Sequence, residues 1–153
     1  MIQILNRKQT KEVEEYLWEQ FGAHEIPGRL FQLGEEKIFL FSGEASDDDI
    51  RELEGMVPVE RLGVYFAKVM NGEIRLSIEG TQLLKNQIKK NIFELDKEQA
   101  EKWMQGQELN IHMGKKGFFV MKYKNDFLGC GKASEEKIGN FIPKMRRLKN
   151  KLN

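Results

Sequence analysis

Short strand-like runs, separated by glycine and polar turn residues, fill most of the second half of this chain. Runs of this kind joined by tight turns are typical of small β-barrels. One helix interrupts them, because Asp96 and Gln99 form a capping box that opens a helix ending at Gly106. The pattern predicts a small, closed or nearly closed barrel, with strands at residues 91–95, 108–112, 117–123, 127–133 and 138–142.

Two helices are expected in the first 80 residues. The first can be capped by Asn6 or Thr10 and ended by Gly22, because apolar residues recur between them at four-residue steps. The second follows Ser46, whose hydroxyl can cap a helix that starts with the three aspartates at 47–49. Three adjacent carboxylates also fit a metal site, but their position at a helix start favours capping. The apolar residues of the first helix are Val13, Leu17 and Phe21.

Two hairpins are expected between and after these helices. Residues 34–36, which begin with a glycine, separate two apolar runs as a three-residue turn would. Asn71 and Gly72 readily take the positive φ that a tight hairpin needs. The first 80 residues therefore read as an α+β unit, with strands at residues 30–33, 37–41, 61–69 and 72–77.

The composition changes near residue 80. Residues 78–90 are polar and increasingly basic, which is typical of a helix followed by a linker. We therefore expect an α+β protein of two modules, a helix-flanked antiparallel sheet at 1–80 and a small β-barrel at 81–153. The chain has 153 residues, 40% of them apolar and ten of them Phe, which is enough to form a core without disulfides.

Charge is segregated between the two modules. Residues 1–80 hold 9 Lys and Arg against 16 Asp and Glu, a net charge of −7. Residues 81–153 hold 16 against 8, a net charge of +8. A polyanion that contacts the second module releases counterions from its phosphates, and the acidic module orients that contact. The alternative is that the uneven charge reflects chance and solubility.

The residues that most often carry catalysis are scarce and isolated. His24 and His112 stand outside any nucleophile or metal motif, so both are interpreted as ordinary, partly exposed histidines. Cys130 lies on an expected strand, where packing explains a small apolar side chain. Gly129 and Gly131 lack the third glycine of a dinucleotide fingerprint, and their expected role is to let the strand bend or another backbone pass close. We expect no enzyme activity, no metal and no cofactor.

The single cysteine also indicates the redox conditions of the cellular compartment. It excludes an internal disulfide framework and a Cys-based zinc cluster, so a reducing compartment is expected. No stretch approaches the roughly 18 apolar residues of a membrane-spanning helix, and no apolar run follows a basic start. A soluble, cytoplasmic protein is expected.

Basic residues gather around the turns and the end of the expected barrel. If those elements are neighbours, their loops bring the positive side chains onto one face that can bind phosphates. The alternative is a solvated basic tail. Tyr123 and Phe127 can stack on bases, although core packing is the commoner role of such aromatics. The candidate RNA-binding residues are Lys115, Lys116, Lys122, Lys124, Lys132, Lys144, Arg146, Arg147 and Lys149.

Residues 117–132 resemble the PUA domain, named for pseudouridine synthases and archaeosine transglycosylases. The match is an apolar strand, a polar turn and then Leu128-Gly-x-Gly131. Residues 140–148 look like the ending of PUA-like domains attached to Sun-family RNA cytosine-5 methyltransferases. The resemblance implies that the RNA face includes the basic positions Lys115, Lys132, Lys144, Arg146 and Arg147.

The resemblance extends upstream. Residues 61–68 and 73–76, followed by the Leu83-Leu84 helix, are similar to the pre-PUA module of the eukaryotic and archaeal factor required for assembly of the large ribosomal subunit. That family is a non-catalytic RNA-binding adaptor. Its similarity implies a pre-PUA-like module followed by a PUA-like barrel.

Two hypotheses from different classes follow, with a third behind them. The first is a non-catalytic protein that binds structured RNA, rRNA or tRNA, in ribosome biogenesis or RNA modification. The second is an adaptor whose acidic first module docks a ribosomal protein or a modifying enzyme. The third is a small RNA-modifying enzyme that uses Cys130. No membrane partner is expected.

Overall fold

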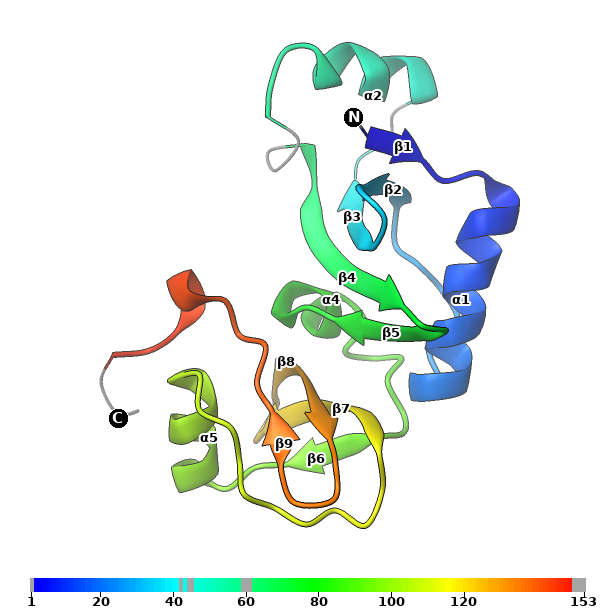
Figure 1. The fold of residues 1–153 in the computed structure, drawn as a ribbon. Helices are drawn as coiled ribbons and strands as arrows, with labels where there is room; N and C mark the ends of the chain where they lie inside the picture. Colours follow the sequence, from blue (N-terminus) through cyan, green and yellow to red (C-terminus); the bar gives the residue numbers. More distant parts are fainter. Residues whose placement is uncertain (1, 42, 44–45, 59–61, 150–153) are drawn as a thin grey trace.

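Two sheets, one above the other in Figure 1, carry the fold. The computed structural model describes residues 2–41, 43, 46–58 and 62–149. The first sheet is antiparallel, and its strands in spatial order are β1 (Ile2–Ile4), β2 (Arg29–Leu33), β3 (Lys37–Phe41), β4 (Val64–Met70) and β5 (Glu73–Leu76). The strands of the second sheet, in order, are β6 (Ile92–Glu94), β7 (Gly117–Tyr123), β8 (Asp126–Ala133) and β9 (Ile138–Gly139). The predicted α+β class is confirmed, with the second sheet curled into a half-barrel.

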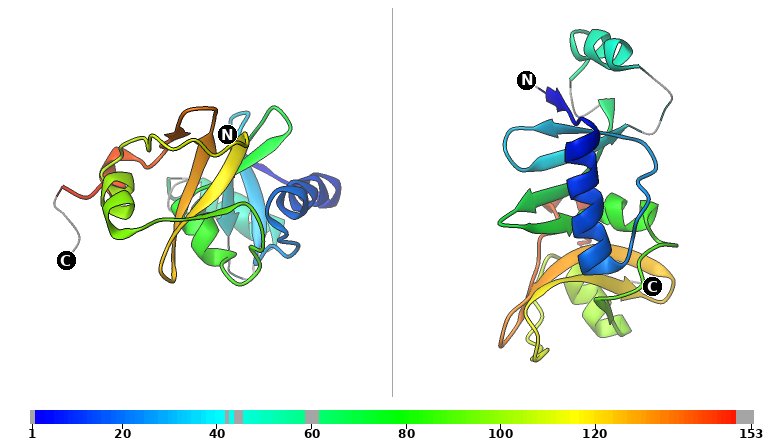
Figure 2. Two further views of the ribbon diagram at one scale, coloured as in Figure 1. Left: turned by 90° about the horizontal axis from the view of Figure 1, so that it is seen from below. Right: turned by 90° about the vertical axis from the view of Figure 1, so that its right-hand side faces the viewer.

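The first helix, α1 (Arg7–Phe21), has the ends that the sequence predicts. The Asn6 side chain accepts a hydrogen bond from the backbone N–H of Gln9, whose own side chain accepts one from the Asn6 N–H. Gly22 ends the helix with a φ of 75°. One stripe of α1 is buried in the core, and the helix crosses the strands of the first sheet, with its C-terminal end beside the second sheet (Figure 2).

Both predicted hairpins of the first sheet are present. Gly34 opens the first turn with a φ of 70°. Asn71 and Gly72 form the second turn with φ angles of 52° and 75°, as their sequence predicts. Arg61, where a strand was expected to begin, lies outside the described residues. The strands are β2 (Arg29–Leu33), β3 (Lys37–Phe41), β4 (Val64–Met70) and β5 (Glu73–Leu76).

A strand that the sequence did not predict opens the chain. β1 (Ile2–Ile4) pairs antiparallel with β2, with Ile2 opposite Leu33. Its three residues are too few to show an alternating pattern. The pairing therefore depends on the tertiary contact of Ile2 with the core rather than on local sequence.

The second helix, α2 (Asp47–Glu54), starts with the capping box predicted for Ser46. The Ser46 hydroxyl accepts from the Asp49 N–H at 3.1 Å, and the Asp49 carboxylate accepts from the Ser46 N–H. This confirms the capping box for Ser46 and Asp49, and all three aspartates lie in the first turn of the helix. Asp47 also forms an ion pair with Arg29, and the described residues hold no group of three side chains suited to a metal ion. Ile50 is buried with Phe31 and Phe39, so α2 covers part of the face of the first sheet opposite α1.

A short helix, α4 (Ile78–Leu83), joins the two sheets. It packs so closely on β4 that a Cβ at Gly80 would lie 2.3 Å from the backbone oxygen of Phe66. On its other side, the Thr81 hydroxyl accepts from the N–H of Gly129 at 3.2 Å and donates to the Ile78 carbonyl at 2.7 Å. The helix therefore holds β4 and β8 against each other.

The second sheet surrounds a smaller apolar cluster. Trp103 of α5 is fully buried there, and its indole N–H donates to the Leu128 carbonyl. The capping box of Asp96 and Gln99 that opens α5 is confirmed. A short 3-10 helix, η1 (Lys144–Arg146), lies near the end of the chain. The other elements are β6 (Ile92–Glu94), α5 (Lys97–Met104), β7 (Gly117–Tyr123), β8 (Asp126–Ala133) and β9 (Ile138–Gly139).

The second sheet differs from the predicted barrel in two places. Residues 108–112 form no strand, and only Leu109 bridges to Ile138. The run expected at 138–142 is a strand for two residues only, because Asn140 turns away and binds the end of α5. In addition, β6 pairs with β7 in parallel, which short runs and turns cannot reveal.

The largest apolar cluster contains residues of both sheets. Leu17 and Phe21 of α1 belong to it together with Phe118, Val120 and Phe127 of the second sheet. The predicted module boundary at 80/81 falls inside α4. The division into 1–80 and 81–153 stays a proposal. Among the described residues, no helix has the length and apolar character needed to cross a membrane.

Candidate nucleic-acid interface

The β7–β8 hairpin divides the predicted basic residues of the barrel into two groups. Lys115 and Lys116 precede β7 and lie at the open end of the hairpin, where Lys132 pairs with Phe118. Lys122 and Lys124 lie at the turn. The seven residues of β7 separate the groups by roughly 20 Å. These lysines therefore line the length of one hairpin rather than gather at one point.

Lys122 and Lys132 sit on the same side of the hairpin. Lys122 lies 5.7 Å from the centre of the Phe127 ring, and Lys132 lies 5.2 Å from that of Phe118. Each also has a distant carboxylate, Glu94 at 3.9 Å and Glu73 at 4.0 Å respectively. Ion pairs this long and this exposed stabilise by well under about 1 kcal/mol, so both ammonium groups can exchange them for a phosphate.

The other three lysines of the hairpin are exposed. Lys116 faces Glu135 at 3.9 Å, and Lys124 lies 5.4 Å from the centre of the Tyr123 ring. Lys115 has no ion pair among the described residues. All three side chains can move to reach a polyanion.

Residues 140–149, which we call the basic tail, are docked on the protein. The Asn140 amide donates to the carbonyls of Trp103 and Gln107 at 2.8 and 2.9 Å. Further along, the N–H of Leu148 donates to the Met104 carbonyl at 2.8 Å. The tail is therefore held at the end of α5, while the side chains of Lys144, Arg146 and Lys149 are exposed, so the alternative of a solvated basic surface stays open.

The side chains of Arg146 and Arg147 make internal polar contacts, whereas no ion pair of Lys144 or Lys149 is found among the described residues. Arg146 forms an ion pair with Glu79 of α4. Arg147 donates to the Ile142 carbonyl at 3.0 Å and packs over Gly106, where a Cβ would lie 2.3 Å from its Nε. Lys144 and Lys149 are exposed and have no ion pair among the described residues. The four predicted positions thus divide into two that dock the tail and two that remain open to a ligand.

The aromatic candidates of the hairpin also separate. Phe127 is 4% exposed and belongs to the main core. Tyr123 is partly buried against the cluster around Trp103. Core packing is therefore the role of Phe127, and Tyr123 presents only part of its ring.

Cys130 is a packing residue. It is buried between the sheets, and burial raises the pKa of its thiol to about 12. A thiol with this pKa is almost entirely protonated at neutral pH, so it is a poor nucleophile. Gly129 takes a φ of 81° beside Ile78, and Gly131 lies under Trp103, as expected for glycines that allow close approach.

Sequence reasoning missed two surface residues next to the predicted set. Arg75 of β5 lies 4.1 Å from the centre of the Phe141 ring, which is 40% exposed. The Asn71-Gly72 turn sets Lys68 opposite Arg75. The register of this hairpin could therefore have predicted that Arg75 lies beside Lys68 on one face of the sheet. Nothing local indicates that Phe141 would reach it from the other end of the chain.

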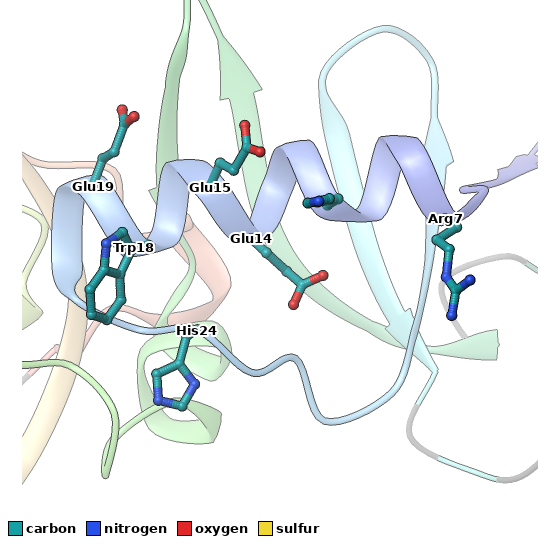
Figure 3. A pocket seen from close by; sticks show the side chains of 7 residues that line it. Arg7, Glu14, Glu15, Trp18, Glu19 and His24 are labelled. Atoms are coloured by element: carbon teal, nitrogen blue, oxygen red, sulfur yellow. The ribbon is translucent and has the colours of Figure 1, made fainter.

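A second surface lies on α1, away from the basic tail. Figure 3 shows Trp18 and His24 close together, with Glu15 and Glu19 pointing to the other side of the helix. Trp18 is 57% exposed, its ring centre 6.0 Å from that of His24. These side chains line an open hollow of about 620 Å³ together with Arg7, Lys11, Glu14, Glu15 and Glu19. The hollow offers an aromatic surface with carboxylates nearby.

Comparison with known proteins identifies the second sheet. Residues 90–148 match the family model described as the methyltransferase RsmF PUA domain. The chain carries a PUA domain. This confirms the resemblance of residues 117–132 to that domain and of the basic tail to the ending of its Sun-family form.

The PUA domain and the sheet before it are both covered by similar proteins. Ribosomal RNA small subunit methyltransferase F of Psychromonas ingrahamii is 26% identical over 144 residues, which cover 90% of this chain and 29% of the relative. The protein of that name from Vibrio cholerae is 22% identical over 140 residues, with 91% and 28% covered. The chain therefore spans less than a third of the length of these relatives.

Proposed function

We propose that this chain binds structured RNA, rRNA or tRNA, in ribosome biogenesis or RNA modification, and that it contributes RNA affinity rather than catalysis. The PUA domain at residues 90–148 is the observation that carries the proposal. The curated relatives are named as ribosomal RNA methyltransferases, and this chain spans about 29% of one of them. The activity of those longer proteins is not part of the proposal for this chain.

The proposed contacts are chiefly to phosphates. Lys144 and Lys149 of the basic tail are open to a ligand, as are Lys115, Lys116 and Lys124 along the hairpin. A-form RNA offers phosphates and 2′-hydroxyls more readily than base edges, so shape dominates its recognition. We propose Arg146 and Arg147 as supports that hold the tail in place for these lysines, with RNA contact as their second role.

The test is fluorescence anisotropy with total tRNA and with rRNA fragments, at several salt concentrations between roughly 50 and 200 mM. The double variant Lys144→Gln, Lys149→Gln removes two charges without touching a docking contact. The matched control Lys8→Gln, Lys11→Gln removes the same charge from α1. We expect the tail variant to reduce the slope of log affinity against log salt by about 1.4 to 1.8, at 0.7 to 0.9 for each phosphate contact. The control should keep the slope of the parent protein, and a parent protein that binds neither RNA at the lowest salt would contradict the proposal.

The hollow on α1 supports a second candidate function, docking of a basic protein segment. An exposed Trp with Glu14 on the same side of α1 suits a partner that supplies an apolar side chain flanked by Lys or Arg. A ribosomal or RNA-modifying protein that stays bound after nuclease treatment, and is lost from the variant Trp18→Ala, would support this function. Partners removed entirely by nuclease would favour RNA binding alone.

A further inference from the structure

One register row of the first sheet places three cations side by side. Lys37 of β3 pairs with Lys68 of β4, and Lys68 pairs with Arg75 of β5. Residues directly opposite each other in a sheet project from the same face, with Cβ atoms roughly 5 Å apart. The three side chains therefore form a continuous basic row across the strands, in a part of the chain where acidic residues outnumber basic ones.

This row is only partly neutralised. Like charges that face each other across strands are destabilising. Lys68 has Glu36 at 3.6 Å, but Lys37 and Arg75 have no ion pair among the described residues. The unpaired charge suits an anionic partner, because a phosphate beside each cation removes the repulsion between them.

An aromatic group extends the row toward the PUA domain. The guanidinium of Arg75 lies over the ring of Phe141, whose centre is 6.3 Å from that of Phe118. The ammonium of Lys132 lies 5.2 Å from the centre of the Phe118 ring. On the first sheet, Tyr65 lines a small cavity together with Arg75 and Phe141, and its ring centre is 5.7 Å from that of Phe39. Arg75 of the first sheet and Lys132 of the second thus lie next to the exposed ring of Phe141 and the buried ring of Phe118, respectively.

We propose that this face binds an unpaired stretch of RNA, with phosphates on Lys37, Lys68 and Lys132 and one base stacked on Arg75 and Phe141. Stacking needs an exposed base face, which a duplex hides and an unpaired nucleotide offers. The inference deepens the proposed function and rests on it, since it adds a site for single-stranded RNA beside the surface for structured RNA.

The probes are an RNA hairpin with a short single-stranded extension and the same hairpin with a blunt end. The variant Arg75→Gln, Phe141→Leu removes the stacking platform, and Leu keeps apolar contact with Phe118. Lys37→Gln changes an exposed charge at the far end of the row. Lys8→Gln, Lys11→Gln serves again as the control. Thermal unfolding of each variant shows that it is folded.

The parent protein should bind the extended hairpin about tenfold more tightly than the blunt one, the gain expected from one stacked base. The stacking variant should lose this preference and keep its affinity for the blunt hairpin. Lys37→Gln should weaken binding of the extended hairpin alone. If the parent protein binds both hairpins equally, or if the variants keep the preference, the inference is overturned while the proposed function stands. If the parent protein binds neither hairpin, both this inference and the proposed function are contradicted.

Discussion

At the scale of single residues, Gly131 shows why the second sheet can close around Trp103. A Cβ at this position would lie 2.5 Å from Cγ2 of Ile138 and 2.8 Å from Cη2 of Trp103. Gly131→Ala should therefore lower the free energy of unfolding by about 1–3 kcal/mol, the usual cost of overpacking. Gly139→Ala is the control, because its nearest contact would be an ordinary 3.7 Å. Urea denaturation measures both, and equal stabilities would show that the sheet can expand at Gly131.

Cys130 gives a second prediction at this scale. Burial raises its pKa from 9.0 to about 12, so the folded protein keeps a neutral thiol where the unfolded chain ionises. The stability that this provides is fully present below pH 9 and is lost as the pH rises from about 9 toward 12. Iodoacetamide at about pH 8 should label the folded protein far more slowly than the urea-unfolded chain. Comparable labelling rates would mean that the thiol is accessible.

At the scale of elements, helix ends and hairpin turns could be predicted from the sequence. The capping residues Ser46 and Asp96 and the turn at Asn71-Gly72 act through neighbours within a few residues, so local sequence determines them. The pairing of β1 and the parallel register of β6 depend on contacts between distant segments. Local patterns carry no information on such contacts, and the sequence predicted neither.

Arg147 is one of the side chains that hold the basic tail on the protein. Arg147→Ala removes the hydrogen bond to the Ile142 carbonyl and the packing of the side chain on Gly106. This should lower the free energy of tail docking by about 0.5–1.5 kcal/mol. Tail opening should then become more frequent, so the Leu148 amide, bonded to the Met104 carbonyl, should exchange its hydrogen faster. Lys149→Ala is the control and should leave this rate unchanged. A protected Leu148 amide in Arg147→Ala would show that Arg146 and Asn140 hold the tail without Arg147.

At the scale of the whole molecule, the candidate site was only partly visible in the sequence. The basic residues of the PUA domain could be predicted from the net charge of the two halves of the sequence, because they lie close together along the chain. The row of Lys37, Lys68 and Arg75 comes from three strands of the acidic half, and only strand pairing brings it together. Likewise, the contact of Arg147 with Gly106 shows a structural role that residue type alone cannot distinguish from RNA binding.

The shared core predicts how the molecule unfolds. Phe118, Val120 and Phe127 of the PUA domain are buried together with Leu17 and Phe21 of α1, so neither sheet can open without exposing apolar surface of the other. The chain should therefore unfold in one transition, as small cooperative units do. Trp103 is fully buried in the second sheet, and its fluorescence in the variant Trp18→Phe reports on that sheet alone.

Far-UV circular dichroism reports largely on α1, the longest helix described, which packs on the first sheet. The urea midpoints of the two signals should coincide. Phe127→Ala should lower the free energy of unfolding by about 3–5 kcal/mol, because it leaves a cavity in the common core. Both urea midpoints should therefore fall together. Two separate midpoints, with only the Trp103 signal shifted by Phe127→Ala, would instead establish 1–80 and 81–153 as independent modules. Coincidence would mean that the PUA domain needs the first sheet to keep its RNA-binding residues in place.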